Sequence, residues 1–125
     1  TYIIMGYLVQ RSTDATVIDL LRTNGTGGTI DGTWGDSTKT TCLITSIMIT
    51  ASAASTVDLR LETSATTSAD RYILDGLVMP ASTTITIDTP IEFDRSTTDL
   101  VLELGSADDD VTIFVRYNET KKITI

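Results

Sequence analysis

The stretch of residues 72–93, YILDGLVMPASTTITIDTPIEF, decides the fold class of this 125-residue chain. Both of its halves carry apolar residues at the two-residue spacing of a β-strand. Pro80 and Pro90 end the two halves, because proline has no N–H to donate to a sheet. Ala81-Ser82 supplies a turn between the halves, and Asp75-Gly76 supplies a bend within the first. The stretch therefore predicts a β-hairpin with a corner in it.

The rest of the chain repeats short apolar runs separated by polar turns, about eight to twelve residues apart, as all-β sandwiches do. Further strands are expected over residues 2–9, 16–22, 41–50, 57–62, 100–104, 111–116 and 123–125. Segment 16–22 also fits a turn of helix, but its β-branched residues favour a strand. In segment 41–50, alternation predicts two faces: Leu43, Thr45, Ile47 and Ile49 on one, and Cys42, Ile44 and Met48 on the other.

These patterns predict an all-β fold for a single domain, residues 1–125. We expect an antiparallel β-sandwich of about eight to nine strands, with either jelly-roll or Ig-like topology.

The composition favours an exposed β-protein and excludes several classes of partner. Threonine occupies 25 of the 125 positions, and its branched side chain suits the solvent face of a strand. The net charge is −8 and the nine basic residues are scattered, which argues against nucleic acid as a partner. Residues 2–9 are too few to span a bilayer, so no membrane partner is expected. Cys42, the single cysteine, is expected as a buried thiol rather than a link between subunits, in a protein made in a reducing cytoplasm.

The sequence shows no arrangement of residues that is typical of a catalytic site. The sequence contains no histidine, which removes the commonest general base and the main zinc ligand. It also has no glycine-rich phosphate loop followed by lysine. Glu92 with Glu103, or Asp75 with Asp88, would have to converge across a cleft to act as a glycosidase pair, whereas acidic residues at turns and edges are usually solvated. We therefore expect no enzymatic activity, no catalytic residue and no cofactor.

Three adjacent carboxylates, Asp108, Asp109 and Asp110, form an acidic run. A calcium ion accepts carboxylate ligands in flexible geometry, so a calcium site is one interpretation. Adjacent residues converge poorly on one ion, and a solvated acidic turn is the favoured interpretation. No metal site is therefore predicted.

The apolar ends and a glycine-rich loop indicate assembly. Exposed apolar strands aggregate, so residues 1–9 and 123–125 are expected either to pair with each other inside the sandwich or to bury against neighbouring subunits, residues 1–9 then forming an assembly arm. The long loop 23–37 holds Trp34, which fits either a partner anchor or a cover over one end of the sandwich. Partner-binding residues are accordingly predicted at Tyr2, Ile3, Ile4, Trp34, Ile123 and Ile125.

Residues 45–117 resemble small β-sandwich virion proteins of tailed bacteriophages. The resemblance rests on VDLRLE, a polar turn, RYILDGLVMPASTTITID, PIEFD and DLVLELGSADDDVTIFVRY, in that order. These are strand and turn motifs that cover a little over half of the chain, and they carry over no catalytic residue. The first 40 residues lie outside the resemblance, and we expect docking to a particular virion partner there.

The resemblance implies a non-enzymatic virion structural protein and favours a capsid decoration (cement) protein. Such a protein binds the outer head shell through the major capsid protein or another virion protein, and stabilises the particle by many weak contacts. By analogy we expect a homo-oligomer, a trimer, on the outer capsid surface of the virion after synthesis in the host cytoplasm. A neck, tail or fibre module is the nearest alternative. The alternative from another class is a carbohydrate-binding or adhesin module that stacks a glycan on Trp34, Tyr72 or Tyr117.

Overall fold

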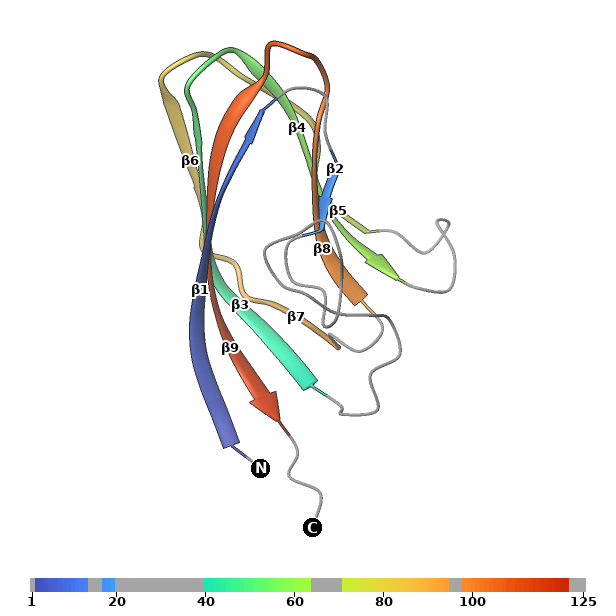
Figure 1. The fold of residues 1–125 in the computed structure, drawn as a ribbon. Helices are drawn as coiled ribbons and strands as arrows, with labels where there is room; N and C mark the ends of the chain where they lie inside the picture. Colours follow the sequence, from blue (N-terminus) through green and yellow to red (C-terminus); the bar gives the residue numbers. More distant parts are fainter. Residues whose placement is uncertain (1, 14–16, 20–39, 64–70, 95–97, 122–125) are drawn as a thin grey trace.

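The computed structural model describes residues 2–13, 17–19, 40–63, 71–94 and 98–121. The loop 23–37 with Trp34 and the tail residues Ile123 and Ile125 lie outside the described residues. Nine strands make up the described part: β1 (Tyr2–Thr13), β2 (Val17–Asp19), β3 (Thr40–Ala51), β4 (Ser55–Thr63), β5 (Arg71–Met79), β6 (Thr83–Ile87), β7 (Ile91–Asp94), β8 (Thr98–Leu104) and β9 (Asp110–Lys121). The same residues include no helix long and apolar enough to cross a membrane. The predicted antiparallel β-sandwich is confirmed (Figure 1).

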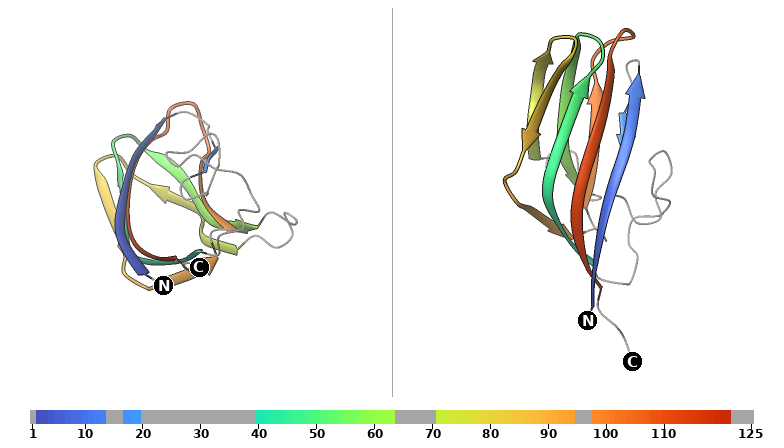
Figure 2. Two further views of the ribbon diagram at one scale, coloured as in Figure 1. Left: turned by 60° about the horizontal axis from the view of Figure 1, so that its bottom comes forward. Right: turned by 90° about the vertical axis from the view of Figure 1, so that its left-hand side faces the viewer.

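Two sheets enclose the core. The first has the strand order β1-β9-β3-β6, with β7 also pairing with β3, and the second has the order β2-β8-β4-β5. β3 and β4, β5 and β6, and β8 and β9 lie in opposite sheets, so the chain crosses the sandwich at each of these turns, at the upper end of Figure 1. Figure 2 (right) shows the strands of the first sheet side by side. This alternation between sheets is the jelly-roll arrangement, which decides between the two predicted topologies.

The predicted hairpin over residues 72–93 is wrong in its pairing, although both of its strands exist. β5 pairs with β4 in the second sheet, whereas β6 pairs with β3 in the first. The turn between them carries the chain across the sandwich: Ser82 has a φ of 61°, and its N–H donates to the carbonyl oxygen of Ala51 at 2.8 Å. The Thr83 hydroxyl donates to the carbonyl oxygen of Pro80 at 2.6 Å. Periodicity identifies strands, but it does not identify which neighbour satisfies their backbone groups.

The predicted bend at Asp75-Gly76 is confirmed as an irregularity in β5. Gly76 has a φ of 65°, in the left-handed region that glycine adopts without a steric penalty. Its N–H donates to the Asp58 carboxylate, and the β4–β5 register shifts between Val57 and Leu59. The bend is therefore a β-bulge in an edge strand.

The predicted faces of segment 41–50 are wrong because β3 contains a bulge. The β3–β9 register shifts between Ile44 and Ser46, which leaves Thr45 as an extra residue. The extra residue reverses the alternation, so the inward side chains, each at most 1% exposed, are Cys42, Ile44, Ile47 and Ile49. Met48, which was grouped with Cys42 and Ile44, points outward and is 37% exposed.

The core consists of alternating inward residues from both sheets. The strands predicted over residues 57–62, 100–104 and 111–116 are confirmed as β4, β8 and β9. Their inward side chains at most 3% exposed are Val57, Leu59, Leu100, Leu102, Leu104, Val111, Ile113 and Val115. Cys42 is fully buried, as predicted, and it is in no disulfide bond. Val101, which alternates with Leu100 and Leu102 in β8, is fully buried as well, so this strand is covered on both faces there.

The first strand pairs with β9, whereas the sequence offered the tail 123–125 as its partner, and that tail lies outside the described residues. β1 runs antiparallel to β9 along its whole length. β9 continues through residues 118–121, beyond the predicted end of this strand at residue 116. These residues stay in the sheet because β1 and β3 pair with them from both sides.

Gly6 allows an aromatic ring to lie against the inner side of β1. Gly6 and Tyr117 are direct cross-strand partners, and a Cβ on Gly6 would lie 2.7 Å from Tyr117 Cζ and 2.8 Å from its hydroxyl oxygen. The Tyr117 side chain is partly buried and packs against the core, which limits the room for the ring to move. The ring thus covers backbone that glycine leaves bare.

We expect Gly6→Ala to lower the free energy of unfolding by about 1–3 kcal/mol, because the added methyl group displaces the Tyr117 ring. In a Tyr117→Leu background the same substitution should cost less than about 0.5 kcal/mol, since the colliding atoms are gone. Urea unfolding of the four proteins of this cycle measures the coupling. Equal costs in the two backgrounds would contradict this packing.

Candidate functional site

Exposed large apolar side chains of the described residues gather on the outer side of the first sheet. Six residues form this apolar face: Ile3, Met5, Tyr7 and Val9 of β1, Met48 of β3 and Phe114 of β9. Their exposed fractions run from 37% at Met48 to 83% at Met5. The two other exposed large apolar side chains in the described ranges, Tyr72 and Val78, lie on β5 of the second sheet.

Strand alternation and sheet register together produce this face. In β1, Leu8 and Ser12 are 7% and 2% exposed and point inward, so the alternate residues point outward. These outward positions carry apolar side chains where a solvent-facing strand usually carries polar ones. Register adds the neighbouring strands, because Val9 is the cross-strand partner of Phe114, which is the partner of Met48. A contiguous exposed apolar patch marks an interaction site in a soluble protein.

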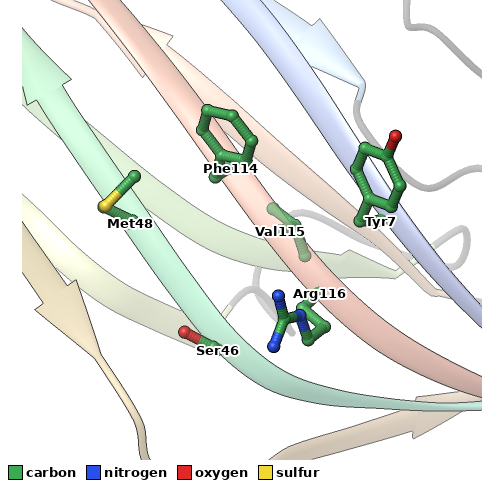
Figure 3. Close-up of a pocket in the computed structure, with 6 residues that line it drawn as sticks. All are labelled: Tyr7, Ser46, Met48, Phe114, Val115 and Arg116. Carbon is green, nitrogen blue, oxygen red and sulfur yellow. The ribbon is translucent and has the colours of Figure 1, made fainter.

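An open depression of about 350 Å³ lies within this outer surface. Three strands line it: β1 with Tyr7, β3 with Ser46 and Met48, and β9 with Phe114, Val115 and Arg116 (Figure 3). Arg116 is the cross-strand partner of both Tyr7 and Ser46, and Figure 3 shows its guanidinium group turned towards the Ser46 side of the depression. The Ser46 hydroxyl donates to Asp88 Oδ1 at 3.3 Å. This combination can hold an apolar side chain together with a carboxylate.

An ion pair limits the apolar face at one end of β1. Arg11 Nε and Nη2 donate to Asp110 Oδ1 and Oδ2 at 3.0 and 2.7 Å. This bidentate hydrogen bonding holds the pKa of Asp110 below its usual value. Residues 2–10 of the same strand carry no charged side chain. The part of the face on β1 is therefore uncharged, on a protein whose net charge is −8.

The predicted partner-binding residues overlap with this face only in part. Ile3 is 68% exposed and belongs to it, and Tyr2 and Ile4 are its neighbours on β1. Trp34, Ile123 and Ile125 lie outside the described residues. The sequence prediction missed five members of the face: Met5, Tyr7, Val9, Met48 and Phe114. The first three stand in the apolar run 2–9, where alternation could have found them, but the last two depend on register between distant strands.

The aromatic residues considered for glycan stacking do not form one surface. Tyr117 belongs to the first sheet and packs against the core beside Gly6. Tyr72 is 52% exposed on β5, in the second sheet. Trp34 lies outside the described part of the chain. Tyr72 and Tyr117 therefore do not share a surface, whereas the first sheet places Tyr7 and Phe114 in a common depression.

The acidic pairs considered for hydrolysis lie on different sheets. Glu92 is on β7 of the first sheet and Glu103 on β8 of the second, where Glu103 Oε1 lies 3.7 Å from Arg60 Nη1. Asp75 is on β5, whereas Asp88 follows β6 of the opposite sheet. Among the described residues, no three His, Cys, Asp or Glu side chains are grouped so that they could hold a metal ion.

Asp109, in the middle of the acidic run 108–110, organises a turn. Its side chain is only 4% exposed. Oδ2 accepts hydrogen bonds from the backbone N–H groups of Gly105, Ser106 and Thr56 at 2.9, 3.0 and 3.3 Å. Oδ1 accepts one from the Ser106 hydroxyl at 2.9 Å. The carboxylate thereby ties the β8–β9 turn to the start of β4.

The interpretation of this run as a solvated turn is therefore wrong for two of its three residues. Asp109 is buried in the turn, and Asp110 pairs with Arg11. Asp108 alone is exposed. The three carboxylates have different surroundings because consecutive side chains along the backbone point in different directions.

The hydrogen bonds to Asp109 also set its protonation. Burial by itself would raise the pKa, but the Ser106 hydroxyl and the three backbone N–H donors outweigh it, so the pKa of Asp109 lies below its usual value. A pKa that is lower in the folded than in the unfolded protein stabilises the fold above the unfolded value of about 3.9. This stabilisation is lost as the pH falls through the folded-state pKa.

We expect Asp109→Ala to lower the free energy of unfolding at pH 7 by about 2–3 kcal/mol, because three backbone N–H donors and the Ser106 hydroxyl lose a charged, buried acceptor. Asp109→Asn should cost less, since its amide oxygen can still accept. Both variants should lose stability less steeply than the wild type as the pH falls below about 4, whereas exposed Asp108→Asn should follow the wild type. Melting temperatures measured across this pH range test the assignment. An acid transition equally steep in Asp109→Asn would contradict it.

The sequence matches no protein-family model and no curated protein. The fold is similar to that of a solved structure of Bacillus endospore appendages, described as a novel family of disulfide-linked pili. The match covers 97% of this chain and 89% of the other, with a TM-score of 0.52 and 10% sequence identity. At this identity the similarity concerns the fold, and it supports the β-sandwich.

Proposed function

We propose that this protein is a non-enzymatic structural subunit of a large assembly, and specifically a capsid decoration protein on the outer head of a tailed bacteriophage. The apolar face carries the proposal. It places six large apolar side chains on one side of the first sheet, five of them on β1 and β9, in a region without charge along residues 2–10. Such a surface gains free energy when another protein covers it, at about 25 cal/mol for each Å² of apolar area.

The strands that carry the face suit docking on a repetitive surface. β9 is held between β1 and β3 by antiparallel pairing on both sides, so the side chains stand on a firm base. A preorganised surface loses little conformational entropy on binding. Individual contacts of this size are weak, but an oligomer that spans several identical sites on a shell binds much more tightly through multivalency.

The virion assignment comes from the resemblance of residues 45–117 to phage β-sandwich proteins. The similarity to a pilus subunit fits an assembly role as well, but that pilus is described as disulfide-linked. Cys42 is the single cysteine of this chain and is fully buried, so it is not placed to link subunits. We therefore propose non-covalent assembly, with synthesis in the host cytoplasm and the major capsid protein as the partner.

We expect the protein to sediment with purified phage particles from a producing culture, in a copy number comparable to that of the major capsid protein. Quantitative mass spectrometry of gradient-purified particles measures this ratio. A few copies per particle would instead place the protein in the neck, tail or fibre. Its absence from particles would overturn the proposal.

We expect Phe114→Lys to weaken binding to particles that lack the protein by at least about tenfold, because a charge replaces an apolar contact and resists burial. Val78→Lys is the matched control, since Val78 is equally apolar and 70% exposed but lies on the second sheet. Cosedimentation of each purified variant with such particles gives the affinities. Equal binding of the two variants would exclude the apolar face as the docking surface.

A further inference from the structure

The edge of β1 differs from the other sheet edges in the described residues. β2 has three residues, β6 has five and lies between Pro80 and Pro90, and β5 is interrupted by the bulge at Gly76. Short strands, prolines and bulges are the devices that keep sheet edges from pairing with other chains. β1 has twelve residues and contains no proline, and its described pairing is with β9 alone. The edge of β1 therefore lacks the features that keep the other described edges from pairing with another chain.

The charge pattern of β1 favours a second copy of this chain as the partner. The protein has a net charge of −8, so two copies repel each other over most of their surface. Residues 2–10 carry no charge, and the first charged residue, Arg11, already pairs with Asp110. Two copies thus approach each other along β1 without bringing like charges into contact.

We propose that two copies of this protein pair antiparallel along their β1 edges, about a two-fold axis at Gly6. In this register Ile3 of one copy lies opposite Val9 of the other, and Met5 lies opposite Tyr7. Each apolar side chain then meets an apolar side chain, and cross-strand pairs of this kind stabilise sheets. The pairing rests on the edge of β1 and not on the proposed function.

The two-fold pairing has a definite structural consequence. The first sheets of both copies join into one continuous sheet, and their apolar faces become neighbours on the same side. A two-fold interface uses the same surface on both partners, so it closes at two copies and does not grow into a fibre. It therefore gives a dimer, where the family resemblance implied a trimer.

The area buried between the two copies determines how tightly they are expected to bind. Full coverage of the outward side chains of β1 in both copies would remove at most on the order of 1,000 Å² of surface from water, near the lower limit for a specific interface. Main-chain hydrogen bonds along the edge add to this contact. We therefore expect a dimer that dissociates on dilution.

The test is the mass of the protein in solution across concentrations from about 1 µM to 1 mM, by sedimentation equilibrium. The wild type should change from monomer to dimer over this range. Met5→Lys should raise the dissociation constant of the dimer at least about tenfold, because a charged lysine on an edge strand disfavours pairing with another strand. Val78→Lys, with the same charge change on the other sheet, should behave as the wild type. Melting temperatures verify that each variant is folded.

Phe114→Lys separates this inference from the proposed function. Phe114 lies on β9, behind the edge strand, so its substitution should leave the dimer intact while it weakens particle binding. Met5→Lys is read for the dimer alone, because Met5 belongs to the apolar face as well as to the edge strand. A wild type that remains monomeric throughout, or forms a trimer, would overturn the pairing.

Cysteine cross-linking tests the register. Directly opposite residues of an antiparallel pair have Cα atoms about 4.5–5.5 Å apart, within the range of a disulfide. A mixture of Met5→Cys and Tyr7→Cys proteins should therefore form disulfide heterodimers on mild oxidation, whereas either variant alone should cross-link several-fold more slowly. Cys42 does not compete, because it is fully buried. Equal cross-linking in all three samples would exclude this register.

Discussion

The antiparallel ladder that joins β9 to β1 on one side and to β3 on the other is the constraint on which the structure depends. It fixes the phase of β9, so that Val111, Ile113 and Val115 enter the core. The same phase turns Phe114 outward, between Val9 and Met48. A slip of one residue would exchange the two sides and expose the core. One set of backbone hydrogen bonds therefore builds both the core and the apolar face.

Local sequence patterns predicted the structure wherever a strand depends only on its own residues. The alternation of Ile85 and Ile87 with threonines in β6 is an example, and so is the bend at Gly76. Prediction failed where one extra residue reverses the faces of a strand, or where a residue distant in the sequence determines the surroundings of a side chain. The bulge at Thr45 reverses the faces of β3, and only the pairing with β9 reveals it. From the sequence, Asp109 is expected to be an exposed acid. Its burial could not be predicted, because one of its hydrogen-bond donors is Thr56, which is distant in the sequence.

The candidate site, too, could be predicted from the sequence only in part. The apolar run 2–9 predicted that β1 takes part in assembly, and alternation separates its inward Leu8 from its outward residues. The full face appears only after folding, because Met48 and Phe114 come from strands far along the chain. β1 then has two separate roles: its outward side chains extend the face, and its edge offers main-chain groups to a second copy. A pair built on that edge presents two faces in one plane, which suits a repeating surface.

Hydrogen exchange along β1, compared between dilute and concentrated protein, tests the central claim most directly. In an antiparallel strand the amides point alternately to the two sides, so an edge strand has one set bonded to its neighbour and one set open. We predict that the amides of residues 2–10 exchange more slowly in concentrated protein, while those of β5, an edge strand with a bulge, exchange equally at both concentrations. Exchange along β1 that is independent of concentration would contradict a self-pairing edge.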